Sequence, residues 1–492
     1  MAYNAYDVEK NQGYAANSGE YSPPHGGLEK RHGSYQEPDG AVPGESFEYG
    51  TGMRAKLMRF AGKIGIEQRG IERVPEDERT DTGFRSLLNV GTMWCSANMV
   101  VSSFALGLLA NSLFFLGVAD AMLLIAIFNV LACVGWSSVN SIVGAQLLNA
   151  VNSDVPGYAG IIVIAVCTWL VTLFGYKIVH IYEFWSWIPS FIIFLIVLGV
   201  FAHSGDYVDI PWATGTAEMG SVLSFGSVIF GFAIGWCSYA ADYTCYQPSS
   251  ASKVKVFGWT FLGLIFPLLL TQMLGVAVFS ATAGNGGSNR YADGWASSGT
   301  GGILGAVLIY HLGGFGKFCL VMLALSIIAN NCPNIYSVGL TVQVLGRWIQ
   351  YVPRFVWTTI ATAAYIAIAI PGYTHFEAVL QNFMNFIGYW LAIYSSIGLT
   401  EHFVFKRGFS GYRPEDYDNP SKLPPGIAAI FAFCCGVIGM VAGMSQVWWV
   451  GWIALHAGEA PFGGDVGWEL GAAFSMVAYL IARPIELRLF GR

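Results

Sequence analysis

Charged residues are scarce in this chain, and most of it has no long polar stretch. Only 11% of the 492 residues are Asp, Glu, Lys or Arg, whereas 54% are hydrophobic, and the mean hydropathy is +0.52. Soluble domains contain about 25% charged residues. The composition therefore excludes secreted, nucleic-acid-binding and ordinary cytosolic proteins, and it indicates a polytopic membrane protein.

The patterns of an enzyme, a metal site or a disulfide framework are also missing. The nine cysteines lie in apolar runs without paired metal-site spacing, and the eight histidines are scattered. There is no nucleophile elbow, no His-Glu-x-x-His and no phosphate-binding glycine loop. We therefore expect no enzyme activity, no cofactor and no metal.

The first part of the chain has no long apolar run. Residues 1–52 are rich in Gly, Ser, Tyr, Asn and Pro, cannot bury enough apolar surface to fold, and are expected to be disordered. Residues 53–66 place apolar side chains at helical spacing and basic ones on the other faces. We expect a short basic amphipathic helix on an anionic membrane surface, or alternatively a solvated linker, within a cytoplasmic tail of residues 1–85.

The rest of the chain is a series of apolar runs of about the 20 residues that a helix needs to cross the hydrocarbon. Lys and Arg concentrate in every second connection, which assigns those connections and both termini to the cytoplasm. We expect a transmembrane domain over 86–484, a short cytoplasmic C-terminus over 485–492 and a Gly-rich outer loop over 283–302. A further span at 136–155 is doubtful. The expected spans are 88–110, 113–134, 159–179, 184–203, 219–243, 256–280, 315–341, 354–371, 377–400, 426–447 and 465–483.

The tripeptide Trp-Cys-Ser occurs twice, at 94–96 and at 236–238, each time inside an apolar run and before polar residues. Transporters built from inverted repeats carry interrupted helices at corresponding places in their two halves, with the binding site between them. Gly235 precedes the second Trp, and its missing Cβ would let the helix unwind and a ligand approach the backbone. The repetition therefore predicts two interrupted helices at a central site.

Polar residues inside apolar runs are candidate functional groups, because burying them in lipid is costly. Trp136 and Asn140 share one helix face, where an aromatic plane beside an amide suits a flat polar heterocycle. Trp236 could stack on such a ring, and the run Asn-Asn-Cys-Pro-Asn at 330–334 puts three amides around a proline break. The alternative for each is ordinary helix packing, which we prefer for Asn382 and Asn385.

Glu183 lies at the edge of an apolar run and is surrounded by aromatic residues. Partly apolar surroundings would favour its protonated form and let it carry a proton near neutral pH. The alternative is a wet carboxylate at the membrane interface.

Four separate motifs point to one known family. They are Gly-Ile-Glu-Arg-Val-Pro-Glu at 70–76, Ser-Ala-Asn-Met at 96–99, Gly-Trp-Ser-Ser-Val-Asn at 135–140 and His-Ile-Tyr-Glu at 180–183. From about residue 65 onward the chain resembles the fungal purine-cytosine permeases of the nucleobase-cation-symport-1 family. The resemblance implies an all-α, LeuT-like fold with a five-plus-five inverted repeat and 11–12 transmembrane helices. It also implies proton-coupled import of cytosine, adenine, guanine or hypoxanthine across the plasma membrane.

The resemblance implies site residues as well. By motif match, the substrate-contacting positions of the family fall on Ser96, Trp136, Asn140, Trp236 and Asn331. Glu183 matches its essential carboxylate. The expected partners are a nucleobase, H⁺ as coupling ion and the lipid bilayer, with no nucleic acid and with an oligomeric state that the sequence does not give.

The chain departs from the family at one place. Met122-Leu123-Leu124 runs directly into the next apolar residues, where the family has a Phe-Gly-Pro-Arg stretch and a basic loop between its second and third helices. Two half-helices and a loop, roughly thirty residues, are therefore expected to be absent. The alternatives to a nucleobase transporter are an amino-acid or other small-solute carrier of the same architecture, and a non-transporting variant.

Overall fold

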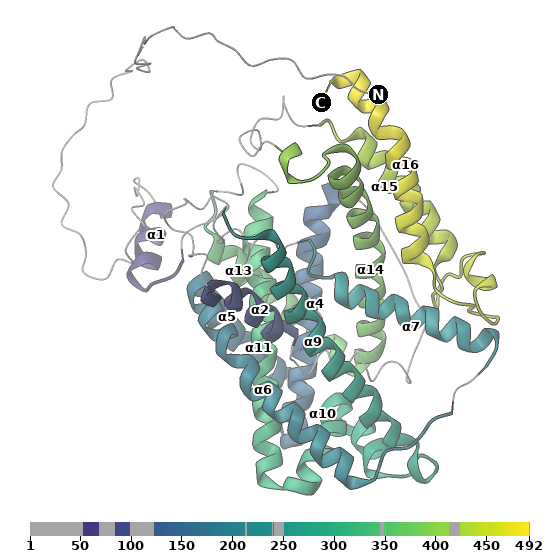
Figure 1. Cartoon of the computed structure of the whole chain (residues 1–492). Coiled ribbons are helices and arrows are strands. Elements are labelled where there is room, and N and C mark those ends of the chain that lie inside the picture. The colour runs from purple at the N-terminus through teal and green to yellow at the C-terminus, as the bar shows by residue number, and fades with distance from the viewer. Residues whose placement is uncertain are drawn as a thin grey trace, which may run out of the picture. The chain divides into compact units, whose positions relative to one another are not determined.

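The computed structural model describes residues 53–67, 84–98, 123–211, 214–238, 240, 250–344, 349, 351–412 and 424–491. These residues form helices and their connections, and the one strand-like pairing among them is the isolated bridge between Ser445 and Val450. The predicted all-α class is confirmed (Figure 1). The expected tail over 1–52 and the expected shortening near Met122 lie outside the described residues.

Most predicted spans correspond to one helix each. Those helices are α2 (Phe84–Asn98), α5 (Gly157–Leu173), α6 (Tyr176–Ser204), α7 (Thr216–Ile234), α9 (Lys253–Ser280), α11 (Gly314–Val344), α13 (Arg354–Gly372), α14 (Phe376–Thr400), α15 (Ile427–Gly443) and α16 (Gly467–Phe490). Among the described residues, six helical stretches are long and apolar enough to cross a bilayer. They are Ile181–Ser204, Thr216–Ile234, Lys253–Gly287, Gly314–Gln343, Arg354–Phe405 and Gly467–Phe490. The chain is therefore a multi-pass membrane protein.

The division of 113–155 into two segments is wrong. One continuous helix, α4 (Leu123–Val151), runs through Gly135, the residue that separates the two expected segments and that would suit a turn between them. This glycine serves packing, since a Cβ there would lie 2.3 Å from the ring of Phe383 on α14. The glycine therefore marks a close contact between two helices, and such a contact gives the same sequence signal as a turn.

The expected outer loop at 283–302 is also largely helical. A 3₁₀ segment, η2 (Ala281–Gly287), leads into α10 (Arg290–Leu312). The side chain of Asn289 caps α10 by accepting hydrogen bonds from the backbone N–H groups of Tyr291 and Ala292. The glycines that favoured a loop permit a kink instead, because Gly299 has φ +51° inside α10.

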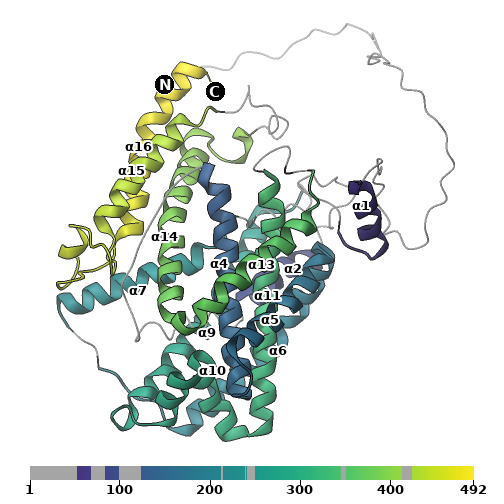
Figure 2. The same cartoon turned by 180° about the vertical axis from the view of Figure 1, so that it is seen from behind.

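Close helix packing brings the central helices together. α4 lies along α11 and also contacts α5, α10 and α13, while α7 packs on α14 (Figure 2). A Cβ at Gly231 on α7 would lie 2.0 Å from the carbonyl oxygen of Met384 on α14. Only glycine permits this approach, and the end of α7 is therefore fixed against α14.

The two ends of the described chain differ in how well they match expectation. α1 (Met53–Lys63) forms where the basic amphipathic helix was expected. At the other end, α16 continues to Phe490, six residues beyond the expected boundary at 484. The C-terminal end of α16 therefore includes residues 485–490, most of what was expected to be a separate C-terminal tail.

Candidate functional site

The candidate site lies where α7 ends. The helix stops at Ile234, and residues 235–238 form turns, so the predicted interruption at Gly235 is observed. A Cβ on Gly235 would lie 3.2 Å from Nε1 of Trp136 on α4, which is tighter than ordinary packing allows. The glycine therefore permits the close approach of the two tryptophan-bearing segments.

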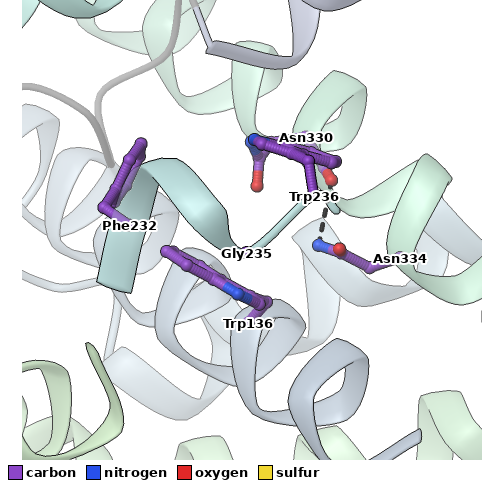
Figure 3. A pocket seen from close by; sticks show the side chains of 6 residues that line it. All are labelled: Trp136, Phe232, Gly235, Trp236, Asn330 and Asn334. Atoms are coloured by element: carbon purple, nitrogen blue, oxygen red, sulfur yellow. Dashed lines mark hydrogen bonds between the residues drawn. The ribbon is translucent and has the colours of Figure 1, made fainter. Parts of the chain in front are cut away.

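A small enclosed cavity lies beside this interruption (Figure 3). Its lining comes from α4, α7 with the turn that follows it, and α11, and consists of Trp136, Phe232, Gly235, Trp236, Asn330 and Asn334. The cavity measures about 10 Å³, room for about one water molecule. A flat ligand of several rings would enter only if an aromatic side chain of the wall moved.

Aromatic rings form most of the wall. Trp136 makes edge-to-face contacts with Phe232 at 5.0 Å and with Phe383 at 5.4 Å between ring centroids. Trp236 meets Trp94 on α2 at 5.3 Å and 77°. The tryptophans of the two Trp-Cys-Ser tripeptides therefore lie in contact beside the cavity. The predicted interruption of the first helix concerns residues after Asn98, which lie outside the described residues and leave it a prediction.

Amides from α4 and α11 form a buried hydrogen-bond network behind the cavity. Nδ2 of Asn140 donates to Oδ1 of Asn331 at 2.9 Å and also to Oδ1 of Asn330. Nδ2 of Asn331 donates to Oγ of Ser141 at 3.2 Å, and Nδ2 of Asn334 donates to the backbone carbonyl of Asn330 at 3.0 Å. Oδ1 of Asn140 is buried and has no partner among the described residues. The network fixes the orientation of the amides that reach the cavity.

α11 separates this network from a buried carboxyl group. Asn330 and Asn334 are four residues apart and share the face that lines the cavity. Ile328 and Cys332 lie on another face, where they pack against Val179 of α6. Pro333, which follows Cys332, cannot donate a hydrogen bond to the carbonyl one turn earlier, so α11 is weakened at this point.

The carboxyl group is that of Glu183, in the second turn of α6. Its side chain is completely buried, and neither oxygen has a hydrogen-bond partner among the described residues. It lies within electrostatic range of Cys332 on α11. The alternative of a wet interfacial carboxylate is therefore wrong. An ionised carboxylate without a partner costs several kcal/mol in such surroundings.

The site residues predicted from the sequence divide into groups. Trp136 and Trp236 line the cavity, whereas Asn140 and Asn331 lie behind it in the amide network. The backbone of Ser96 lies in the last turn of α2, and its side chain is outside what the structure describes. Glu183 lies beyond α11 and does not line the cavity.

Sequence reasoning missed three residues of the lining. Asn330 and Asn334 were part of the predicted amide cluster but were not chosen as site residues, although their spacing of four places them on one face. Phe232 was not named at all. It lies four residues before Trp236, so the same spacing rule applied backwards from Trp236 could have found it.

Residues 114–451 match the sequence model of a protein family that is described as permeases for cytosine/purines, uracil, thiamine and allantoin. The chain is 58% identical to the purine-cytosine permease FcyB of Emericella nidulans, over 92% of this chain and 95% of that protein. It is 42% identical to the purine-cytosine permease FCY2 of Saccharomyces cerevisiae, over 88% of this chain and 89% of that protein.

Among solved structures, the chain is similar to Mhp1, a nucleobase-cation-symport-1 family transporter in a closed conformation with bromovinylhydantoin bound. The TM-score is 0.49 and the identity 12%, over 86% of this chain and 96% of that chain.

The alignment with the Emericella nidulans protein also bears on the expected shortening. It spans 494 positions but includes only 92% of the 492 residues here, about 453, which leaves about 41 positions without a residue in this chain. A shortening of roughly thirty residues is compatible with this difference and stays a prediction. The matches to the family model and to both permeases are extensive, and the chain therefore belongs to the fungal purine-cytosine permeases of the nucleobase-cation-symport-1 family.

Proposed function

We propose that the protein is a secondary active transporter that imports cytosine and the purine bases adenine, guanine and hypoxanthine by proton symport. One observation carries this proposal: the cavity has tryptophan rings and amide groups side by side, at the point where α7 is interrupted. Two relatives named as purine-cytosine permeases support the same substrate class.

A nucleobase matches both parts of this wall. Its flat ring stacks on Trp136 or Trp236, and stacking on an aromatic side chain contributes about 1–3 kcal/mol for any base. Its edge carries hydrogen-bond donors and acceptors, to which the amides of Asn330 and Asn334 offer the complementary groups. Stacking thus supplies affinity for many bases, and the amides supply discrimination among them.

The other predicted site residues complete this proposal. Asn140 and Asn331 orient the cavity amides through their hydrogen bonds, and Asn331 reaches the base edge itself when the cavity opens. Ser96, whose backbone lies in the last turn of α2, is assigned to the base by its match to the substrate-contacting positions of the family. Since the cavity is small in this structure, base binding requires a displacement of Trp236 or Phe232.

Proton coupling is assigned to Glu183. The carboxyl is buried without a hydrogen-bond partner among the described residues, so a proton gained or lost there changes the energy of its surroundings strongly. It lies beyond α11 from the cavity, and its charge must therefore act on the base through α11. Pro333 weakens α11 at this level, which favours movement of the helix there.

The proposed location is the plasma membrane, with both termini in the cytoplasm. Two contacts support this orientation, because each joins connections that the distribution of Lys and Arg assigns to the inside. Nζ of Lys253 lies 4.1 Å from the ring centroid of Phe409, and Arg483 forms an ion pair of 3.1 Å with Glu401. Asp206 and Arg290 pair with each other in connections that were both assigned to the outside.

Uptake of radiolabelled cytosine, in cells that lack their own nucleobase carriers, tests the proposal. We expect saturable uptake that adenine competes for and that an amino acid does not. Competition by the amino acid would favour a carrier of that class. If the protein reached the surface and no cytosine entered, cytosine import would be refuted, and uptake of other labelled solutes would separate a carrier of another class from the non-transporting variant.

A further inference from the structure

We propose that residues 53–67 form a membrane-surface anchor, in which α1 binds the anionic headgroups of a lipid bilayer and Glu67 clamps the segment to the ends of α11 and α13. No residue of the anchor lines the cavity. It rests on the exposed face of α1, on the charge of the segment and on the contacts of Glu67.

The exposed side of α1 is apolar. Leu57, Phe60 and Ile64 recur at helical spacing on one face, and their exposed fractions are 38%, 61% and 47%. Met58 and Ala61 lie on a neighbouring face and are buried, with 8% and 1% exposed. One face of α1 is thus already covered, whereas the face richest in large apolar side chains faces outward.

The charges of the segment select an anionic surface as the occupant of that face. Lys56, Arg59 and Lys63 are exposed, and residues 53–66 contain no acidic residue. A helix with an apolar face bordered by lysine and arginine lies in the membrane interface, where its apolar side chains enter the headgroup region and its cations meet anionic lipid. Each lysine or arginine near such a surface contributes a roughly fivefold preference.

Glu67 holds the end of this segment. Nη2 of Arg354 donates to its Oε2 at 2.8 Å, and the hydroxyl of Tyr336 donates to its Oε1 at 3.4 Å. The guanidinium of Arg354 is buried and also lies over the ring of Tyr336, 4.6 Å from its centroid. A charge-assisted bond to a buried guanidinium is among the strong hydrogen bonds of proteins.

Two glycines make room for this clamp. A Cβ at Gly175, which has φ +77° just before α6, would lie 1.9 Å from Oε2 of Glu67. A Cβ at Gly339 on α11 would lie 2.7 Å from Cγ of Arg354. The start of α6, α11 and the start of α13 thus surround one carboxylate that comes from the segment before the first span.

The clamp also sets the height of α1 relative to the bilayer. Arg354 is the first residue of the apolar stretch Arg354–Phe405, so Glu67 lies where a membrane-crossing helix begins. Ile64 is three residues away from Glu67, a distance that the chain spans with at most about 11 Å. The apolar face of α1 is therefore held next to the membrane boundary.

The test uses the full-length protein in lipid nanodiscs, with an environment-sensitive fluorescent amino acid at position 60 and a quencher attached to the lipid chains. One set of nanodiscs contains phosphatidylcholine alone, and the other also contains phosphatidylserine. We expect stronger quenching with phosphatidylserine, and its loss at high salt. In the double variant Lys56→Gln/Lys63→Gln, the ratio of docked to undocked helix should fall about 30-fold.

Lys317→Gln is the matched control, because it removes an exposed lysine in the first turn of α11 and should leave quenching unchanged. Glu67→Gln should lower quenching in the same nanodiscs, since the helix is then no longer held at the boundary. An unquenched probe in both lipids would overturn the proposal, and so would equal quenching with and without phosphatidylserine. Neither result depends on whether the protein transports a base.

Discussion

Two carboxyl groups of this protein are equally buried and differently surrounded. Asp465, in the connection before α16, is completely buried and accepts hydrogen bonds from the hydroxyl of Tyr389 at 2.5 Å and from the N–H groups of Ser445 at 2.6 Å and Gly467 at 3.1 Å. Glu183, in α6, is also completely buried, and it accepts no hydrogen bond from the described residues.

The difference distinguishes a structural carboxyl, Asp465, from a candidate functional one, Glu183. Asp465 ties the connection before α16 to α14, and its own N–H reaches Oγ of Ser224 on α7 at 3.1 Å. Removing it would leave several donors unsatisfied. Glu183 has no hydrogen-bond partner among the described residues, and burial without such partners is a cost that stability alone does not explain. A group retained at such a cost is a functional candidate.

The largest effect is expected at Glu183. With one proton carried per base, a pH difference of about two units supports about 100-fold accumulation. Glu183→Gln keeps the shape of the side chain and cannot release a proton. The base should therefore no longer accumulate, and its concentration inside the cell should stay close to the concentration outside. Uptake at imposed pH gradients measures this.

Glu377→Gln is the matched control, because it neutralises a partly buried carboxyl in the first turn of α14. The role of Glu183 would be refuted if Glu183→Gln accumulated base as the unchanged protein does.

Asp465→Ala should lower the free energy of unfolding by about 3 kcal/mol or more, since each buried donor left without an acceptor costs about 1–3 kcal/mol. Glu183→Leu should leave that free energy unchanged or raise it, because it removes an unpaired buried group. Thermal unfolding of both variants in detergent measures the contrast. Equal destabilisation would mean that Glu183 is structural too.

The burial of Asp465 leads us to expect that the stability of the protein depends on pH. Burial raises the pKa of Asp465 from its ordinary 3.8 to about 6, in spite of its hydrogen bonds. The folded state therefore binds more protons than the unfolded state between these values, and this contribution to stability is present below about pH 4 and lost as the pH rises through 6. The loss is about 3 kcal/mol. In Asp465→Asn, the free energy of unfolding should change less between pH 4 and pH 7 than in the unchanged protein. An equal change in both proteins would assign the pH dependence to other groups.

A substitution of Trp236 tests the cavity, which lies on the side of α11 opposite Glu183. Trp236→Ala should weaken cytosine and purines alike by about 1–3 kcal/mol, because stacking does not depend on which base is bound. Since Glu183 is unchanged, the dependence of uptake on pH should persist. Competition assays on surface-resident protein measure the affinities, with Trp452→Ala as a control at an exposed tryptophan. Unaltered affinity for every base would return Trp236 to helix packing.

The smallest of these effects is expected at Asn331. Asn331→Ala removes one acceptor of Asn140 and one donor to Ser141, and so loosens the amides that face the base. Affinity should fall by about 1 kcal/mol, and the ranking of bases should change, because hydrogen-bonding sites reject ligands that leave their groups unpaired. Inhibition constants for cytosine, adenine and hypoxanthine would reveal this. A uniform loss with an unchanged ranking would contradict a role in discrimination.

The fold class followed from the sequence because repeated apolar runs of bilayer length are typical of membrane-crossing helices. The sequence failed where glycine has two uses: Gly135 marks a close helix contact inside α4, and the glycines of 283–302 mark a kink and turns around α10. A single sequence does not separate these uses, because the difference lies in what packs against the glycine.

The site was predicted only in part, because the features that the sequence did not reveal also depend on packing. Trp136 and Asn140 could be paired by helical spacing, and the Asn-Asn-Cys-Pro-Asn run could be recognised as polar residues in an apolar run. Which of its amides faces the cavity depends on how α11 is rotated against α4 and α7, and that rotation is set by packing. The complete burial of Glu183 depends on packing against α11 in the same way.

Simultaneous recording of base and proton movement in proteoliposomes tests the central claim most directly. Addition of cytosine outside liposomes that contain the unchanged protein should make the outside more alkaline as cytosine enters, and Glu183→Gln should abolish the proton signal. Cytosine entry without any proton movement in the unchanged protein would contradict the account, as would an undiminished proton signal in Glu183→Gln.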